Sequence, residues 1–183
     1  MPEMITHNLA PLTTAFTTHS GRIYIGVVLG FVLLLYLLRR SMVLLSLAAF
    51  PGTLLHELLH FIVGLLLFGR PSGLSVLPRR VAHGYALGSV RFANVRWYNG
   101  CFIGLAPLLL LPLALSLLTW RMHGLQALQV QEIAWAYLLA TLIYAALPSW
   151  PDIKVAATSS WLLLLAVGIY WVMTDQGFRV AKL

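Results

Sequence analysis

Long apolar segments dominate the chain and restrict what it can fold into. Ile23–Leu38 is an unbroken apolar run, bounded by Arg22 and by Arg39 and Arg40. Only 9% of the 183 residues are charged and 60% are hydrophobic, whereas a soluble domain carries about a quarter charged residues. A soluble core of this size could not bury so much apolar surface, so the sequence predicts a polytopic membrane protein.

The apolar pattern predicts an all-α fold of about five transmembrane helices in a single integral membrane domain over residues 1–183. The predicted spans are Ile23–Leu38, Ser41–Gly69, Gly100–Trp120, Val130–Leu147 and Thr158–Thr174. Polar segments precede and follow them at 1–21 and 175–183. The first of these has no basic residue ahead of an apolar core, so we expect no cleaved signal peptide and expect the first apolar run to remain as an anchor.

Residues 70–99 differ from the spans because they are polar and carry five arginines. Within them, Leu74–Leu77 and Tyr85–Phe92 have the composition of short strands. They predict a small β-hairpin or sheet, inserted after the second span and dipping toward the membrane. Its open edge could pair with an extended peptide. The candidate substrate-binding residues are Ser89, Val90, Arg91 and Phe92. A solvated loop anchored by arginines is the alternative.

Charge and cysteine usage exclude several classes of function. The net charge of +7 in a membrane protein indicates loops that face anionic lipid rather than a nucleic-acid partner. Cys101 is the sole cysteine, so an intrachain disulfide and a zinc site built from several cysteines are both excluded. The distribution of Lys and Arg slightly favours a cytoplasmic N-terminus, and we expect the protein in the plasma membrane.

Residues 56–60 form an H-E-x-x-H motif, which is the most informative pattern in the chain. Positions i and i+4 share one face of a helix, so His56 and His60 can both reach one metal ion. Glu57 lies beside that face and suits the role of general base. Two histidines and a glutamate are costly within a membrane-length segment, so they are functional by default. The motif therefore predicts a metal site.

Pro51 interrupts the segment that carries this motif. A proline removes a backbone donor and clashes with the preceding turn, so the sequence predicts a kink or short break at Pro51-Gly52. A break would place His56 near the start of a new helix. An ordinary kink without functional meaning is the alternative.

A catalytic zinc ion usually takes three protein ligands. The chain has few acidic residues that could supply the third. The chain contains Glu3, Glu57, Glu132, Asp152 and Asp175. Asp152 is favoured because it adjoins a proline-broken membrane segment, where irregular backbone must face protein or a water-filled cavity. Its alternative role is a helix N-cap. Glu132 is the alternative ligand, and His83, His123 and Cys101 are less favoured.

The chain resembles the site-two protease family of intramembrane zinc metalloproteases. The resemblance is carried by His56-Glu57-Leu58-Leu59-His60 in one span, by Pro148-x-x-x-Asp152 in a later span, and by the β-rich segment between them. It covers about Ser41 to Val172. The family often has Asn ahead of the proline and Gly after the aspartate, where this chain has Ile153. We therefore expect a minimal, divergent member without a PDZ domain.

This resemblance implies an enzyme that cleaves membrane-anchored proteins within or beside the lipid bilayer. It implies that His56, His60 and Asp152 hold one Zn²⁺ ion and that Glu57 activates water. Two other classes remain open from the sequence: a non-proteolytic membrane scaffold with a structural zinc, and a metal transporter. The absence of a visible inverted repeat argues against the transporter.

Overall fold

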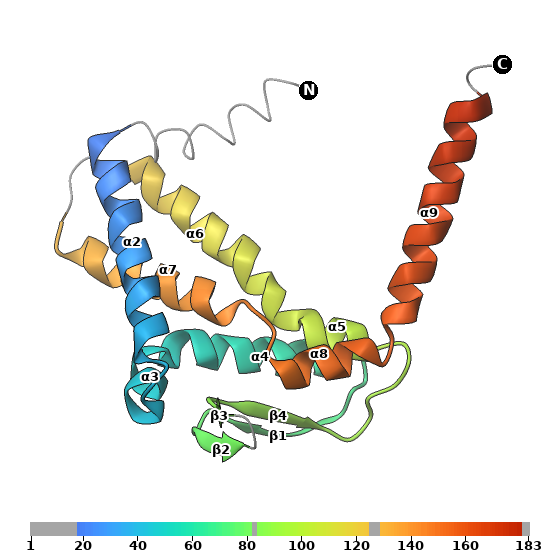
Figure 1. Cartoon of the computed structure of the whole chain (residues 1–183), viewed down its shortest axis with the longest axis horizontal. Helices are drawn as coiled ribbons and strands as arrows, with labels where there is room; N and C mark the ends of the chain where they lie inside the picture. Colours follow the sequence, from blue (N-terminus) through green and yellow to red (C-terminus); the bar gives the residue numbers. More distant parts are fainter. Residues whose placement is uncertain (1–17, 82–83, 125–128, 181–183) are drawn as a thin grey trace.

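The computed structural model describes residues 18–81, 84–124 and 129–180. His83 and most of the N-terminal polar segment lie outside the described residues, as does the end of the C-terminal tail. Helices form most of the fold, and α9 (Ser160–Val180) extends away from the others (Figure 1). The helical class and the β insertion predicted from the sequence are confirmed in this coarse form.

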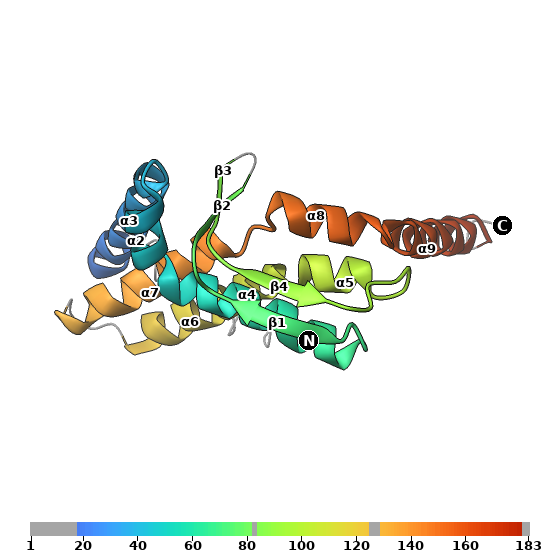
Figure 2. The same ribbon diagram turned by 90° about the horizontal axis from the view of Figure 1, so that it is seen from below.

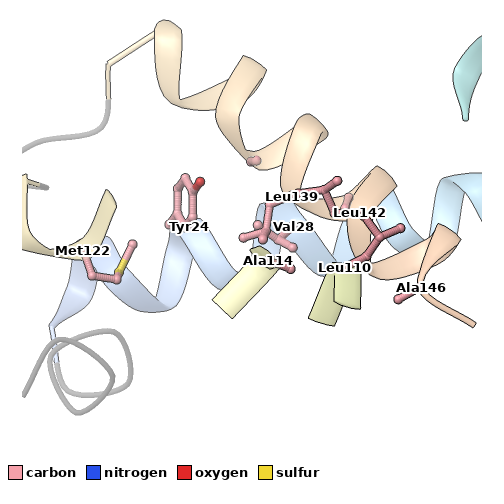
Figure 3. Packing of buried hydrophobic residues seen from close by; sticks show 10 residues of the cluster. Tyr24, Val28, Leu110, Ala114, Met122, Leu139, Leu142 and Ala146 are labelled. Carbon is pink, nitrogen blue, oxygen red and sulfur yellow. The ribbon is translucent and has the colours of Figure 1, made fainter. Parts of the chain in front are cut away.

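The main core lies where three helical elements pack together. These are α2 (His19–Leu38), α6 (Leu110–Gly124) and α7 (Gln131–Ala145). α6 continues from α5 (Gly100–Leu105) through the 3-10 turn η1 (Ala106–Leu109). The buried residues that the three helices share are Tyr24, Val28, Leu110, Ala114, Met122, Ala136, Leu139, Ala140, Leu142 and Ala146 (Figure 3). Small residues among them let the helices approach closely, as membrane helices commonly do.

Two continuous helices are long and apolar enough to cross a membrane, His19–Leu38 and Gly100–His123. Two bent pairs raise the number of candidate spans among the described residues to four. One joins α3 (Met42–Ala48) to α4 (Phe50–Leu66) at 76°, and the other joins α7 to α8 (Trp150–Ala157) at 49°. The last apolar stretch, Leu164–Thr174, is shorter. The structure therefore contains two to four candidate spans, and the predicted five are not confirmed.

The helix break predicted near Pro51 is present and falls just before that residue. Ala49 ends α3 and precedes α4, with φ −97° and ψ 3°. Pro51 then lies in the first turn of α4, where its missing N–H would have had no helical partner in any case. The sharp bend gives α4 a direction of its own and places His56 in its second turn.

Short strands follow α4, and their bounds differ from the predicted ones. β1 (Pro71–Ser75) pairs antiparallel with β4 (Ser89–Phe92), and β2 (Arg79–Val81) pairs with β3 (Gly84–Ala86). The predicted strand over 85–92 is thus two strands with a turn at Leu87–Gly88, and the strand predicted at 74–77 begins earlier and ends at Ser75. β1 and β4 lie along α4, while the β2–β3 hairpin points away from it (Figure 2).

Two asparagines hold the turn that leads from α4 into β1. The Asn94 side-chain amide donates to the Phe68 carbonyl at 2.8 Å, and that of Asn99 donates to the Leu67 carbonyl at 3.2 Å. Phe68 and Arg70 have φ of 57° and 52°, a left-handed conformation that costs free energy for residues with a side chain. The buried Asn99 therefore stabilises a strained turn, and sequence analysis did not single it out.

Gly52 allows α4 to lie against α7. A Cβ atom at this position would collide with the Thr141 carbonyl group and reach the Ala145 Cβ at 3.0 Å. We expect Gly52→Ala to lower the free energy of unfolding by about 1–3 kcal/mol, because overpacking forces the two backbones apart. Thermal unfolding of the detergent-solubilised protein measures this change.

The matched control is Gly30→Ala, also within a helix. A Cβ there meets nothing within 4 Å, so the substitution should stabilise the helix by about 0.5–1 kcal/mol. Equal effects of the two substitutions would contradict the close approach of α4 to α7.

Candidate metal centre

Three side chains converge where α4 meets the start of α8. His56 Nε2 lies 3.4 Å from Asp152 Oδ2, and His60 Nε2 lies 3.1 Å from Asp152 Oδ1. The candidate ligand atoms of all three residues lie within 4.8 Å of one another. Sequence analysis placed these residues together, and the structure brings them together as a group that could hold a metal ion.

Each imidazole is oriented by a backbone carbonyl on its other side. His56 Nδ1 donates to the Ala145 carbonyl and His60 Nδ1 donates to the Ile103 carbonyl, both at 2.7 Å. A carbonyl oxygen only accepts, so each Nδ1 must carry the hydrogen. In a neutral imidazole this leaves the lone pair on Nε2, and Nε2 is the atom that faces Asp152. Metal-binding histidines are commonly fixed in this way.

Breaks in two helices leave these carbonyls free to accept. Ala145 is the last residue of α7, and the N–H four residues later belongs to Ser149, which donates to Asp152 instead. The residue four after Ile103 is Pro107, which has no N–H. The Ile103 carbonyl therefore accepts from the cap residue of α5 and keeps a second lone pair for His60.

The arrangement of acceptors fits a bound cation. His60 is only 4% exposed, and its Nε2 atom has no hydrogen-bond donor among the described residues. A buried acceptor without a partner costs free energy, and here two Nε2 lone pairs face one carboxylate. Protonating both rings instead would bury two positive charges whose ring centroids are 4.9 Å apart, which is also costly. A single metal ion would satisfy all three groups.

Asp152 has a second role, at the start of α8. Its Oδ2 atom accepts from the Ser149 backbone N–H at 2.7 Å and from the Ser149 hydroxyl at 2.6 Å. Ser149 is the N-cap residue, and Asp152 is the third residue of the helix. The alternative role considered for Asp152, the N-cap itself, belongs to Ser149, while Asp152 supports the start of α8 from the third position and remains a ligand candidate. The S-x-x-D spacing is a recognisable helix-start signal, but sequence analysis did not identify Ser149.

Close packing of α5 against α8 brings Asp152 within reach of α4. A Cβ atom at Gly104 would collide with the backbone carbonyl of Asp152 and lie 2.8 Å from the Ala156 Cβ. One turn earlier, a Cβ at Gly100 would collide with the Thr158 hydroxyl. The sequence places both glycines in a predicted span, but their role in positioning the carboxylate follows only from the tertiary contacts.

Glu57 lies outside this group and faces the turn between β3 and β4. It is 6% exposed and makes no hydrogen bond within the part of the chain that the structure describes. A Cβ atom built on Gly88 would lie 2.5 Å from Glu57 Oε1 and 2.6 Å from its Cγ. The carboxylate thus lies against the backbone of this turn, and no donor among the described residues occupies its oxygens.

The other candidate ligands lie elsewhere. Glu132 is buried in an ion pair with Arg121, so it does not contribute to the group around His56. His123 is exposed and bonds to the Thr119 carbonyl, and the backbone N–H of Cys101 donates to the Ser159 hydroxyl. His83 lies outside the described residues.

The candidate substrate-binding residues Ser89, Val90, Arg91 and Phe92 make up β4. Strand β1 covers one edge of β4, and among the described residues no strand pairs with the other edge. The Phe92 ring packs on Gly64 of α4, which ties the strand to the helix that carries both histidines.

Comparisons with known proteins do not identify a relative. No family model matches the chain, and neither the curated proteins nor the solved structures searched contain a match. What can be said of the site therefore rests on its own side chains.

We expect Ser149→Ala to weaken metal binding at least about tenfold, because the hydroxyl orients the Asp152 carboxylate and such supporting contacts strongly affect metal affinity. Titration of the purified protein with Co²⁺, followed by visible absorption, measures the affinity.

Ser41→Ala is the matched control for this variant. It removes the N-cap hydroxyl of α3, which accepts from the Leu44 N–H, and so repeats the loss of a helix cap away from the three candidate ligands. If both variants bound Co²⁺ as tightly as the wild type, the assigned role of Ser149 would be wrong.

Proposed function

We propose that the protein is a zinc-dependent intramembrane endopeptidase that hydrolyses peptide bonds of membrane-anchored proteins. The observation that carries this proposal is the convergence of His56, His60 and Asp152 beside Glu57. The apolar helices support a membrane setting, and we propose a multi-pass protein of the plasma membrane.

Zinc is the metal that this donor set favours. Two imidazole nitrogens and one carboxylate oxygen make up a common ligand set of catalytic zinc, which keeps a further position open. His56, His60 and Asp152 would hold the ion, and the carbonyls of Ala145 and Ile103 keep both rings in the required tautomer. When bound, the zinc ion supplies a Lewis acid, which polarises a peptide carbonyl and makes water a stronger nucleophile at neutral pH.

Glu57 is the general base of the proposed reaction. Its carboxylate takes a proton from the attacking water and later returns it to the nitrogen of the leaving amine. Two features support this role: the carboxylate is buried, and no hydrogen bond from the described residues occupies it. Its position next to His56 in the chain keeps it near the ligands without joining them.

Strand β4 is the proposed docking site for the substrate backbone. An extended peptide can add to an open strand edge by main-chain hydrogen bonds, and β4 offers such an edge beside α4. Ser89, Val90, Arg91 and Phe92 would then align the peptide. A membrane-anchored substrate would have to unwind locally, since a helix has no free backbone groups to pair.

We expect Glu57→Gln to bind zinc as the wild type does but to lose at least about a hundredfold in cleavage rate, because the amide cannot accept the proton. The measurements are zinc content by elemental analysis and cleavage of a panel of single-span model peptides in proteoliposomes. Zinc-depleted wild type is the control for background hydrolysis. Undiminished cleavage by the variant would remove Glu57 from the mechanism.

If the zinc-loaded wild type cleaves none of the peptides, the alternative of a scaffold with a structural zinc is favoured. Zinc flux across the same vesicles would favour the transporter.

We expect Asp152→Asn to lower the zinc content of the purified protein severalfold, because a neutral amide is a much poorer ligand than a carboxylate. His123→Asn is the control, since His123 is exposed and remote from the group, and it should keep full zinc content. Unchanged zinc in the Asp152 variant would show that the ion is held elsewhere.

A further inference from the structure

The β segment between α4 and α5 carries a positive charge that no acidic residue of the same segment neutralises. Residues 70–99 contain five arginines and no aspartate or glutamate. All five arginines are exposed, and none forms an ion pair with another described residue. These arginines are Arg70, Arg79, Arg80, Arg91 and Arg96. Arg91 differs from the others because it lies within β4, whose second edge pairs with no strand among the described residues.

The pairing of β4 with β1 shows which backbone groups of β4 face the open edge (Figure 2). The Arg91 carbonyl accepts from the hydroxyl of Ser72 in β1 at 3.4 Å. Two residues later, the Ala93 N–H donates to the Arg70 carbonyl at 3.1 Å, again on the side of β1. The backbone groups of successive residues in a strand point to opposite edges. The neighbours of Arg91 on both sides therefore direct their N–H and C=O groups to the open edge.

The Arg91 side chain lies on the face of β4 that is turned away from α4. The Phe92 ring packs on Gly64 of α4, and successive side chains of a strand alternate between its two faces. An antiparallel peptide at the open edge would exchange hydrogen bonds with Val90 and Phe92, so the residue opposite Arg91 would belong to a non-hydrogen-bonded pair. Side chains approach most closely in such pairs. Opposite charges across them are favourable and like charges are unfavourable.

Strand β4 begins beside the proposed general base. Gly88, the residue before β4, lies against the Glu57 carboxylate. A strand advances about 3.3 Å per residue, so Arg91 lies about 10 Å along the chain from that contact. A peptide paired with β4 would therefore place the residue opposite Arg91 about three residues from a peptide bond held at Glu57.

We propose that Arg91 selects substrates that carry an aspartate or glutamate at the position paired with it. This inference rests on the proposed protease function and names the class of peptide that the protease takes. An anionic lipid headgroup has the same charge, but it cannot pair with a row of alternating N–H and C=O groups. A peptide backbone pairs with both kinds of group, so the combination of a free strand edge and an exposed arginine favours an acidic peptide segment.

The test uses fluorescent single-span peptides that carry one glutamate or one lysine, moved along the extended segment one position at a time. Binding is measured in phosphatidylcholine nanodiscs on the zinc-loaded Glu57→Gln protein, so that bound peptide is not consumed. We expect glutamate to bind about fivefold more tightly than lysine at one position, since one charge pair is favourable and the other unfavourable. The adjacent positions should show no such difference, because their side chains lie on the opposite face.

Adding Arg91→Glu to this protein should reverse the preference at the same position, so that the lysine peptide binds more tightly. Arg80→Glu is the matched control. Arg80 is also exposed and the substitution changes the net charge equally, but it lies in the β2–β3 hairpin that points away from α4. This variant should keep the preference for glutamate. Because the readout is a ratio of two peptides on one protein, unfolding cannot produce the expected reversal.

A glutamate preference that is absent, equal at every position, or unchanged by Arg91→Glu would overturn the proposal. If that variant instead loses retained phosphatidylglycerol and keeps the peptide preference, Arg91 binds a lipid headgroup and the proposal is wrong. Cleavage of the same peptides by the zinc-loaded wild type is followed separately in proteoliposomes. Position-specific binding without cleavage would remove the protease function and leave the charge selection standing, whereas cleavage without charge selection would do the converse.

Discussion

Two carbonyl oxygens released by helix breaks determine the geometry of the candidate metal site. The end of α7 frees the carbonyl of Ala145, and Pro107 frees that of Ile103. Each fixes the tautomer of one imidazole, so both lone pairs face the carboxylate of Asp152. α4 must therefore lie between the end of α7 and α5. Gly52 permits the approach of α4 to α7, and Gly100 and Gly104 on α5 permit the approach of α8, which carries Asp152. Backbone carbonyls without a helical partner are otherwise costly to bury, and here they orient side chains.

The fold class could be predicted from composition, because apolar runs of this length have few other outcomes. The break before α4 was also predictable, since a proline in an apolar segment must interrupt the hydrogen-bond ladder. The number of spans was not, because bends of 76° and 49° depend on tertiary packing. The strand predicted over 85–92 is divided at Gly88, where the chain turns over Glu57. That contact joins residues far apart in sequence, so local pattern did not reveal it.

The candidate site was predictable to the extent that it consists of scarce side chains. His56 and His60 have a helical spacing, and Asp152 stood out among five acids because two prolines precede it closely. Ser149 could have been found from its spacing to Asp152. The two carbonyls that orient the rings could not be found from sequence. Every residue has a backbone carbonyl, and these two are free to accept only because the helix is broken next to them. The group itself is visible in the structure, whereas zinc and protease activity remain proposals.

The contact of Gly88 with Glu57 limits access to the Glu57 carboxylate. A methyl group built on Gly88 would overlap the Glu57 carboxylate, so the turn between β3 and β4 covers Glu57 from this side. Leu87 packs against an apolar cluster of α2 and α3 that includes Leu35 and Leu45. The packing of Leu87 on α2 and α3 thereby holds this turn in place over the Glu57 carboxylate.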